Sequence, residues 1–294
     1  METMDRKAKV ALLSVCSNTA LIILKTIAGI MSGSVSILSE AIHSSMDLIA
    51  SIVAFLSVRM SSQPADEEHP YGHGKIENIS GLVEGLLIFV AAFLIIKEAV
   101  HKISQPSAID QAAIAIGVML ISALVNTIVS RILYKVAKEE DSLALEADAL
   151  HLKTDVYTSL GVGIGILLIK LTGNNVLDPV VAILVALLII KESWNLCSNA
   201  FKPLLDNRLS DQEEEMIREA IRKYNGIIID FHELRTRKSG NMKYVDFDLI
   251  VDKDISVEES HALSTKIVRD LEAILSNVNV SIYVKPGNMP NPAE

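Results

Sequence analysis

Two short stretches of the sequence place a histidine four residues before an aspartate. They are His43 with Asp47 and His151 with Asp155. In an α-helix, residues i and i+4 lie one turn apart on the same face, so each pair presents its two side chains together. Two imidazole nitrogens and two carboxylate oxygens form a tetrahedral ligand set that suits Zn²⁺. The competing interpretation is two separate His–Asp hydrogen bonds that hold helices together.

Both pairs lie in long hydrophobic segments. The chain has 294 residues, of which 50% are hydrophobic and 21% charged, and its mean hydropathy of +0.37 is high for a soluble enzyme. Apolar stretches, each long enough to cross a bilayer, occupy residues 10–31, 36–58, 79–100, 110–134, 148–170 and 178–200. The sequence therefore predicts a membrane domain of six transmembrane helices in residues 1–203.

Helix geometry predicts that the two pairs meet within the membrane. With a rise of about 1.5 Å per residue, His43 and Asp47 lie roughly 13 to 20 Å from the outer end of the second span. Counted back from Lys170, the second pair lies roughly 22 to 29 Å from the same face, so Asp47 and Asp155 reach similar depth. An isolated carboxylate at such depth costs several kcal/mol, and coordination to a dication would offset that cost.

The positive charges are distributed unequally between the two sides of the membrane. Only Lys97, Lys102 and Lys170 fall on one side. The side of the N-terminus carries Arg6, Lys7, Lys9, Arg59, Lys75, Arg131, Lys135, Lys138, Lys202 and Arg208. Because cytoplasmic loops carry the excess of lysine and arginine, both termini are expected in the cytoplasm.

Charge and motifs also exclude some functions. The chain has 36 acidic and 27 basic residues, a net charge of −9, which argues against nucleic acid as a partner. The sequence contains no GxxxxGK[ST] motif for an ATP-driven motor and no HExxH motif. An intramembrane metal-dependent hydrolase is disfavoured, because four protein ligands would leave no open position for water.

Residues 204–294 have the composition of a small soluble domain. Ser210 with Glu213 and Ser256 with Glu259 have the spacing of helix capping boxes. Between the two predicted helices, alternating apolar residues indicate strands over 227–237 and 244–251, and a third strand is expected over 278–284. The order αββαβ predicts a small α/β domain of about 80 residues. A domain of that size is marginally stable alone, so we expect a homodimer.

These features together resemble the cation diffusion facilitator family, and the resemblance extends from the first span to about Pro286. The resemblance implies a dimeric exporter of divalent metals with six transmembrane helices and a cytoplasmic, metallochaperone-like αββαβ domain. His43, Asp47, His151 and Asp155 match the family's intramembrane transport site. With a histidine in both spans, this site resembles that of the family members that prefer zinc.

The resemblance implies further sites. Asp66, His69 and His73, in the loop after the second span, match the family's cytoplasmic loop site; the alternative is a solvated loop with surface histidines. In the C-terminal domain, ligand positions are occupied by His232, Asp248 and His261. At two others, however, Tyr283 and Lys285 replace a histidine and a bridging aspartate. Because an ammonium group repels a dication, we expect that cluster to be absent or reduced to one weak site.

Lys75 and Asp206 match a charged interlock between the membrane and cytoplasmic parts of the family's dimers.

Polar residues elsewhere in the spans suggest simpler roles. Lys25 is expected to snorkel to the membrane interface. Lys153 is expected to pair with an acidic neighbour such as Glu146, or to snorkel. Glu84 could line an access path from the cytoplasm, although helix packing is the simpler interpretation.

The sequence thus predicts a proton-coupled antiporter in the cell membrane that exports Zn²⁺ as its substrate, with no other cofactor. Protonation of the histidines would release the metal on the outer side. Two alternatives stay open: export of Mn²⁺, Fe²⁺, Co²⁺ or Cd²⁺, and a metal-sensing scaffold that does not transport. Many eukaryotic zinc members of the family that this chain resembles carry a histidine-rich segment at the loop over 136–147. This loop contains no histidine, so the resemblance favours a prokaryotic plasma membrane.

Overall fold

The computed structural model describes residues 5–32, 35–104, 112–172 and 177–287. The side chains of several residues near the helix ends, His43 among them, lie outside the described part. The chain divides into two compact units, Met1–Phe201 and Lys202–Glu294. This boundary lies two residues before the one expected from composition.

The first unit consists of six long helices, as the sequence predicts. They are α1 (Arg6–Ser32), α2 (Val35–Ser61), α3 (Lys75–Ser104), α4 (Ala112–Glu139), α5 (Leu143–Thr172) and α6 (Leu177–Phe201). In the described residues, α1, α3, α4 and α6 contain segments long and apolar enough to cross a membrane. The two remaining helices, α2 and α5, are those that contain the histidine–aspartate pairs.

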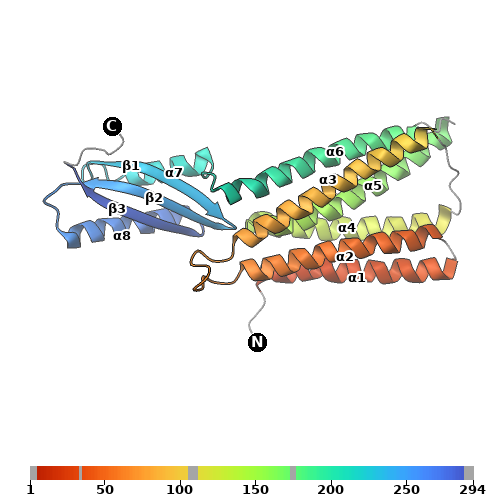
Figure 1. Ribbon diagram of the computed structural model, residues 1–294, viewed down its shortest axis with the longest axis horizontal. Helices are drawn as coiled ribbons and strands as arrows, with labels where there is room; N and C mark the ends of the chain where they lie inside the picture. Colours follow the sequence, from red (N-terminus) through yellow and green to blue (C-terminus); the bar gives the residue numbers. More distant parts are fainter. Residues whose placement is uncertain (1–4, 33–34, 105–111, 173–176, 288–294) are drawn as a thin grey trace. The chain divides into compact units, whose positions relative to one another are not determined.

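The helices run alternately up and down, so the bundle has two distinct ends (Figure 1). We call the end where α1, α3 and α5 begin the proximal end, and the opposite end the distal end. Helix α1 packs along α2, α4 along α5 and α3 along α6, and α5 also contacts α3 and α6. Helices α3 and α5 are therefore parallel neighbours.

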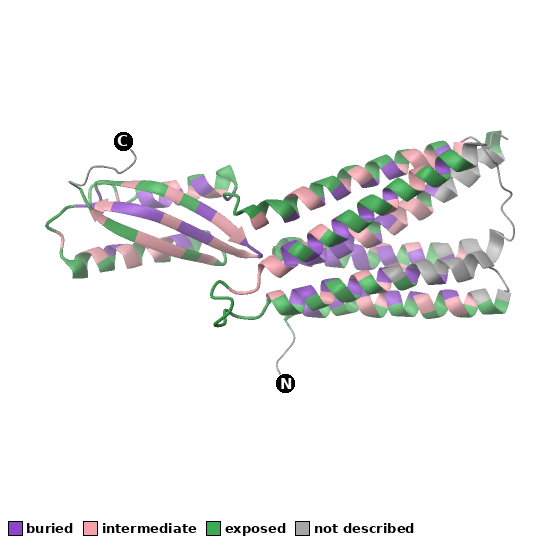
Figure 2. Ribbon diagram, viewed as in Figure 1, coloured by how far each residue is buried: buried purple, intermediate pink, exposed green. Residues whose placement is uncertain are grey.

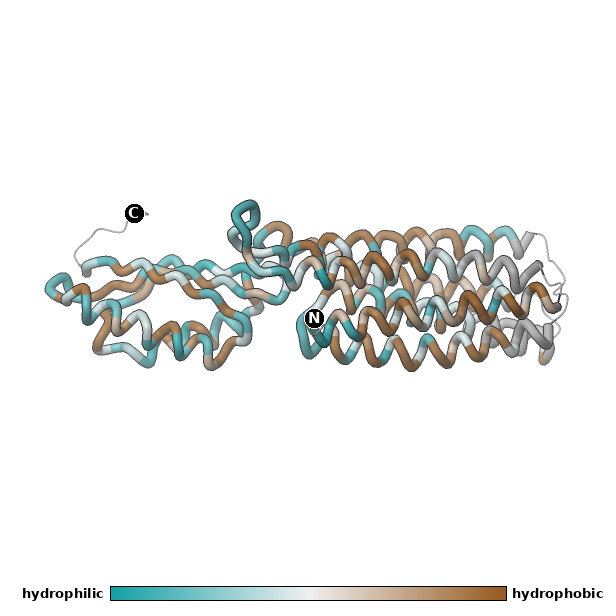
Figure 3. The backbone as a smooth tube through the Cα atoms, turned by 90° about the horizontal axis from the view of Figure 1, so that it is seen from below, coloured by the Kyte–Doolittle hydropathy of each residue, from teal (hydrophilic) through white to brown (hydrophobic). Residues whose placement is uncertain are grey.

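Small and branched residues fill the interior of this bundle. One buried cluster joins α1, α2, α4 and α5 through residues such as Ala11, Val58, Leu133 and Ala144, all fully buried. Small side chains allow helix backbones to approach closely, which is how helices associate in a bilayer. Large apolar side chains such as Phe93, Leu120 and Leu184 are instead exposed, and the described helices of this unit are largely hydrophobic along their length (Figure 3). This pattern suits a lipid environment.

The second unit is the expected αββαβ domain. After a short 3₁₀ helix, η1 (Lys202–Leu205), it contains α7 (Asp211–Arg222), β1 (Asp230–Ser239), β2 (Met242–Val251), α8 (Val257–Ile274) and β3 (Val278–Pro286). Strand β2 is central, antiparallel to β1 and parallel to β3. Both helices contribute buried residues to one core with the sheet, including Ile221, Phe247 and Ile267, and Figure 2 shows the buried stripe along the central strand β2.

Both capping boxes are present. Ser210 accepts a hydrogen bond from the backbone N–H of Glu213, and Ser256 accepts one from that of Glu259; each glutamate accepts one in return from the backbone N–H of its serine. The first strand begins at Asp230 rather than at Ile227. The backbone N–H of Ile227 donates to the carbonyl of Tyr224 at 2.9 Å, so this residue closes a turn.

Candidate metal centre

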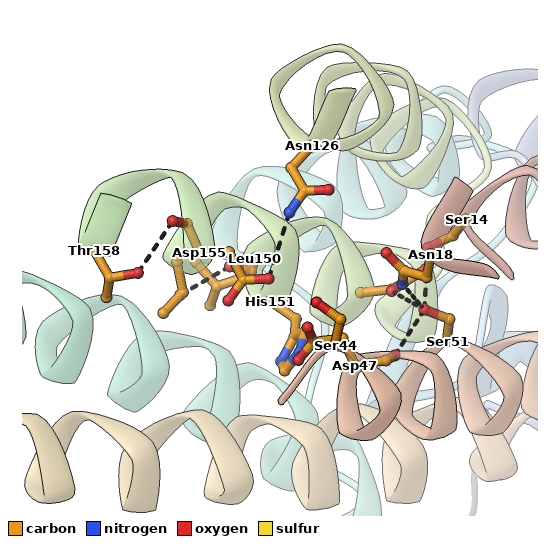
Figure 4. A network of polar contacts seen from close by, with 12 residues as sticks. Ser14, Asn18, Ser44, Asp47, Ser51, Asn126, Leu150, His151, Asp155 and Thr158 are labelled. Atoms are coloured by element: carbon orange, nitrogen blue, oxygen red, sulfur yellow. Dashed lines mark hydrogen bonds and ion pairs between the residues drawn. The ribbon is translucent and has the colours of Figure 1, made fainter. Parts of the chain in front are cut away.

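Three of the four predicted transport ligands lie together inside the membrane unit. His151 Nε2 lies 3.1 Å from Asp47 Oδ1. Ligand atoms of Asp47, His151 and Asp155 all lie within 4.8 Å of one another. Figure 4 shows Asp47 of α2 and His151 of α5 facing each other. Asp47 is buried, and the other two are partly buried. The arrangement offers one nitrogen and two carboxylate oxygens to a single cation; the side chain of His43 lies outside the described residues.

Two neighbouring side chains form hydrogen bonds with these ligand residues. Asn126 of α4 lies with its Nδ2 3.5 Å from Asp155 Oδ2, to which it donates. Ser51, one turn along α2 from Asp47, donates to the backbone carbonyl of Asp47 at 3.0 Å. Asn126 was not singled out from the sequence, although a buried amide within an otherwise apolar span was a signal that could have identified it.

Lys25 corrects a prediction from the sequence. It is buried, with 7% of its surface exposed, and its Nζ donates to Ser44 Oγ at 2.7 Å. It therefore does not snorkel to the membrane interface. Ser44 lies one turn from Asp47 on α2, so a positive charge is held within the bundle beside the metal centre.

The predicted ion pair of Lys153 with Glu146 is not found among the described contacts, whereas snorkelling of this exposed side chain stays a prediction. Its Nζ lies 5.3 Å from the centre of the Tyr157 ring, in cation–π geometry. Glu146, its expected partner, instead forms an ion pair with Lys138, with Lys138 Nζ 2.7 Å from Glu146 Oε1. The cation–π contact gives Lys153 a local partner on its own helix.

A pocket of about 430 Å³ reaches the metal centre between α3, α5 and α6. His151 and Asp155 line it, together with apolar residues of the distal half of the bundle and Glu98 of α3. Helices α5 and α6 approach closely at Gly161, where an added Cβ would lie 3.0 Å from the Val185 side chain. The pocket leads from the candidate ligands toward the distal end.

The predicted loop site also gathers its three residues. His69 Nδ1 lies 3.1 Å from Asp66 Oδ1, and His73 Nε2 lies 3.4 Å from Asp66 Oδ2. The two imidazole rings are 4.4 Å apart between centroids. The backbone N–H of His69 donates to the Asp66 carboxylate and lowers the pKa of that carboxyl, as do the two imidazoles. The chain bends here through Gly72, whose φ of 77° suits glycine, so a turn brings the side chains together.

The three C-terminal candidates are arranged differently. His232 on β1 pairs in register with Asp248 on β2, whereas His261 is exposed on α8. Within the described residues these side chains do not form a three-ligand group. Lys285 on β3 forms an ion pair with Asp248. The Asp248 carboxylate, which a metal ion at this site would need as a ligand, is thus already paired with a lysine.

Lys75 and Asp206, the predicted interlock, belong to different units. Lys75 begins α3, and Asp206 follows η1 and forms an ion pair with Arg237 at 3.5 Å in its own unit. Pairing of Lys75 with Asp206 therefore stays a prediction.

A six-helix membrane unit with a buried His–Asp cluster, joined to a small α/β domain, defines a polytopic membrane protein with a candidate metal centre. Residues 11–205 match the family model described as the cation efflux transmembrane domain, and residues 209–287 match the cation efflux protein, cytoplasmic domain. The chain belongs to the cation efflux family of metal transporters, the cation diffusion facilitators. This confirms the resemblance found in the sequence.

Relatives share nearly the whole chain. A transporter of Synechocystis sp. is 34% identical over 94% of this chain and 89% of its own length. The cation-efflux pump FieF of Shewanella oneidensis is 30% identical over 93% of this chain and 92% of its own length. A solved CzrB chain in its zinc form is 31% identical; the match covers 29% of this chain and 99% of that chain, with a TM-score of 0.28.

Proposed function

We propose that this protein exports Zn²⁺ from the cytoplasm in exchange for protons. The observation that carries the proposal is the meeting of Asp47, His151 and Asp155 from two helices in the interior of the membrane unit. Buried carboxylates are costly unless they are neutralised, and a dication held by both of them supplies that neutralisation. With His43, the set has the two nitrogens and two oxygens that suit zinc.

The proximal end faces the cytoplasm in this proposal, because the excess of lysine and arginine lies there. Zn²⁺ reaches the centre from that side when His151 is neutral and both aspartates are ionised. The helices then rearrange so that the pocket along α3, α5 and α6 connects the centre to the outside. Protons bind the histidines, which no longer ligate the metal, and Zn²⁺ leaves.

The peripheral sites have supporting roles. Asp66, His69 and His73 bind metal at the cytoplasmic end and pass it to the bundle. The C-terminal domain acts mainly in forming the homodimer. Its Asp248 is paired with Lys285 and is therefore not free to bind a metal ion. Lys75 and Asp206 join the two parts near the dimer interface, where an exposed pair would contribute little to stability.

Zinc flux into proteoliposomes under an imposed pH gradient tests the proposal. Asp47→Asn and Asp155→Asn should each abolish flux, because each removes an anionic ligand without changing side-chain size. Glu192→Gln, a carboxylate of α6 outside the metal centre, is the matched control and should transport normally. Monodisperse elution in size-exclusion chromatography verifies folding. Undiminished flux in both aspartate variants would contradict the assignment.

A panel of metals in the same assay tests the substrate. We expect Zn²⁺ to be preferred over Mn²⁺, Fe²⁺, Co²⁺ and Cd²⁺, and His43→Asp to admit cadmium or iron, because an oxygen ligand replaces a nitrogen. A wild type that prefers another metal would overturn the choice of zinc but not transport itself. Metal binding without flux would instead identify a sensing scaffold.

A further inference from the structure

Two buried carboxylates next to the metal centre have unsatisfied oxygens. Glu84 of α3 is 4% exposed, and Asp148 of α5 is fully buried. In the described part of the chain, neither carboxylate oxygen of Glu84 has a hydrogen-bond partner, nor does Oδ2 of Asp148. Burying an ionised carboxylate without a partner costs several kcal/mol. Either a cation must therefore lie beside these two carboxylates, or they must be protonated.

These groups lie one layer toward the proximal end from the metal centre. Asp148 precedes His151 by three residues, so both lie on one face of α5. On α2, Ser51 is one turn from Asp47, and its Oγ lies 3.5 Å from Asp148 Oδ1. One turn corresponds to about 5.4 Å along the helix axis. Asp148 and Ser51 thus form the layer next to the transport ligands.

Glu84 reaches the same layer from α3. The proximal parts of α3 and α5 are in contact, since a Cβ on Gly81 would come within 3.3 Å of the Leu143 carbonyl. Glu84 lies three residues beyond Gly81 and Asp148 five beyond Leu143, so they differ in depth by only about 3 Å. Asp148 and His151 are the charged groups that act most on Glu84.

The nearby lysines are engaged elsewhere. Lys7 forms a buried ion pair with Glu77 at 2.9 Å, two turns from Glu84 along α3. Lys25 donates to Ser44, in the layer beyond Asp47. In the part of the chain that the structure describes, no lysine or arginine forms an ion pair with Glu84 or Asp148. When both are ionised, the carboxylates of Glu84 and Asp148 carry two negative charges, which one divalent cation would balance.

We propose that Glu84 and Asp148, with the hydroxyl of Ser51, form a second divalent-cation site between the proximal end and the metal centre. This inference rests on the proposed function, because it places the site on the route from the cytoplasm. All its donors are oxygens, whereas the metal centre includes imidazole. Zn²⁺ therefore binds more weakly here than at His151, which suits a position that a cation occupies in transit.

Zinc binding to the full-length, metal-free protein tests the site. Equilibrium dialysis compares the wild type with Glu84→Gln/Asp148→Asn, and compares an Asp47→Asn/Asp155→Asn background with and without those two substitutions. We expect the Glu84/Asp148 substitutions to remove one bound zinc ion per chain in both comparisons. Each single substitution, isosteric with its parent, should give the same loss and serves if the double variant does not fold. Glu272→Gln, an exposed carboxylate on α8, should change nothing.

The comparisons separate two kinds of failure. Equal zinc binding by the background with and without the Glu84/Asp148 substitutions, up to about 1 mM zinc, the weak end for oxygen-ligand sites, would overturn the second site. Equal binding by the wild type and the Asp47/Asp155 background would instead overturn the metal centre of the proposed function. A change in proton release alone, with zinc stoichiometry unchanged, would show that the carboxylates hold only protons and would also overturn the second site.

Discussion

At the scale of single residues, the groups that support the ligands matter as much as the ligands themselves. His151 is positioned by Asp47, and Asp155 receives a hydrogen bond from Asn126. An amide that donates to a ligating carboxylate fixes the orientation of that carboxylate, so less ordering remains to be done when the metal binds. Asn126 is therefore a positioning residue rather than a ligand.

Asn126→Ala should weaken zinc binding at the metal centre by about 10-fold or more, because Asp155 loses its orienting donor. Calorimetric titration of the purified protein measures the change. Thr127→Val is the matched control: the Thr127 hydroxyl donates to the Ala123 carbonyl of its own helix, and its loss should leave affinity unchanged. Equal affinities for the wild type and Asn126→Ala would show that Asn126 does not act through Asp155.

At the scale of helices, a buried polar cluster joins the proximal ends of four of them. The carboxylate of Glu77 on α3 pairs with Lys7 of α1 and accepts hydrogen bonds from Ser61 of α2 and from Ser142, the residue just before α5. Lys7 and Glu77 are both almost fully buried. Removal of one member would leave an uncompensated charge in the bundle.

Lys7→Met should destabilise the membrane unit by about 3–5 kcal/mol, the range for breaking a buried ion pair from one side. Thermal unfolding in detergent measures this loss. The double variant Lys7→Met/Glu77→Met should recover part of it, because no charge is then left unpaired. Arg6→Met, which breaks an exposed pair with Glu139, should cost little. A loss for Lys7→Met no larger than for Arg6→Met would contradict this role.

The capping box of α8 makes the stability of the second unit depend on pH. The Ser256 hydroxyl and backbone N–H lower the pKa of Glu259. Because the pKa is lowered in the folded state, the stabilising contribution is complete above the ordinary pKa of glutamate. It is lost as the pH falls through the lowered value.

Ser256→Ala should destabilise the unit by about 1 kcal/mol at neutral pH, as is usual for a serine N-cap. The difference from the wild type should shrink at acid pH, where Glu259 is protonated in both proteins. Thermal unfolding of the full chain at several pH values measures this. Ser260→Ala is the control, since its hydroxyl only donates to the Val257 carbonyl. A difference independent of pH would exclude the contribution of Glu259.

At the scale of the whole molecule, the described metal-ligand groups are concentrated in residues 1–201. The two groups of three candidate ligands, around Asp66 and around His151, both lie in the first unit. In the second unit, Lys285 neutralises Asp248. The family's cytoplasmic domain is thus retained here with one of its expected ligands already paired to a lysine.

Lys285→Asp should create zinc binding in the second unit, because it frees Asp248 and adds a second carboxylate beside it. Zinc stoichiometry of the full chain should rise relative to the wild type. Lys266→Asp, the same change on the exposed face of α8, should leave it unchanged. If the wild type already binds zinc through Asp248, Lys285→Asp will produce no gain.

The sequence alone was sufficient for the six helices, the αββαβ order, both capping boxes and the family, because hydropathy and local hydrogen bonding act over neighbouring residues. The spacing of His151 and Asp155 likewise determines that they share a face. The tertiary structure decided which groups meet across helices. Asn126 with Asp155, Lys25 with Ser44 and Lys285 with Asp248 are contacts between segments distant in sequence. Burial decided the rest: Glu84 and Asp148 become informative only because packing buries them and leaves both oxygens of Glu84 and Oδ2 of Asp148 without a hydrogen-bond partner among the described residues.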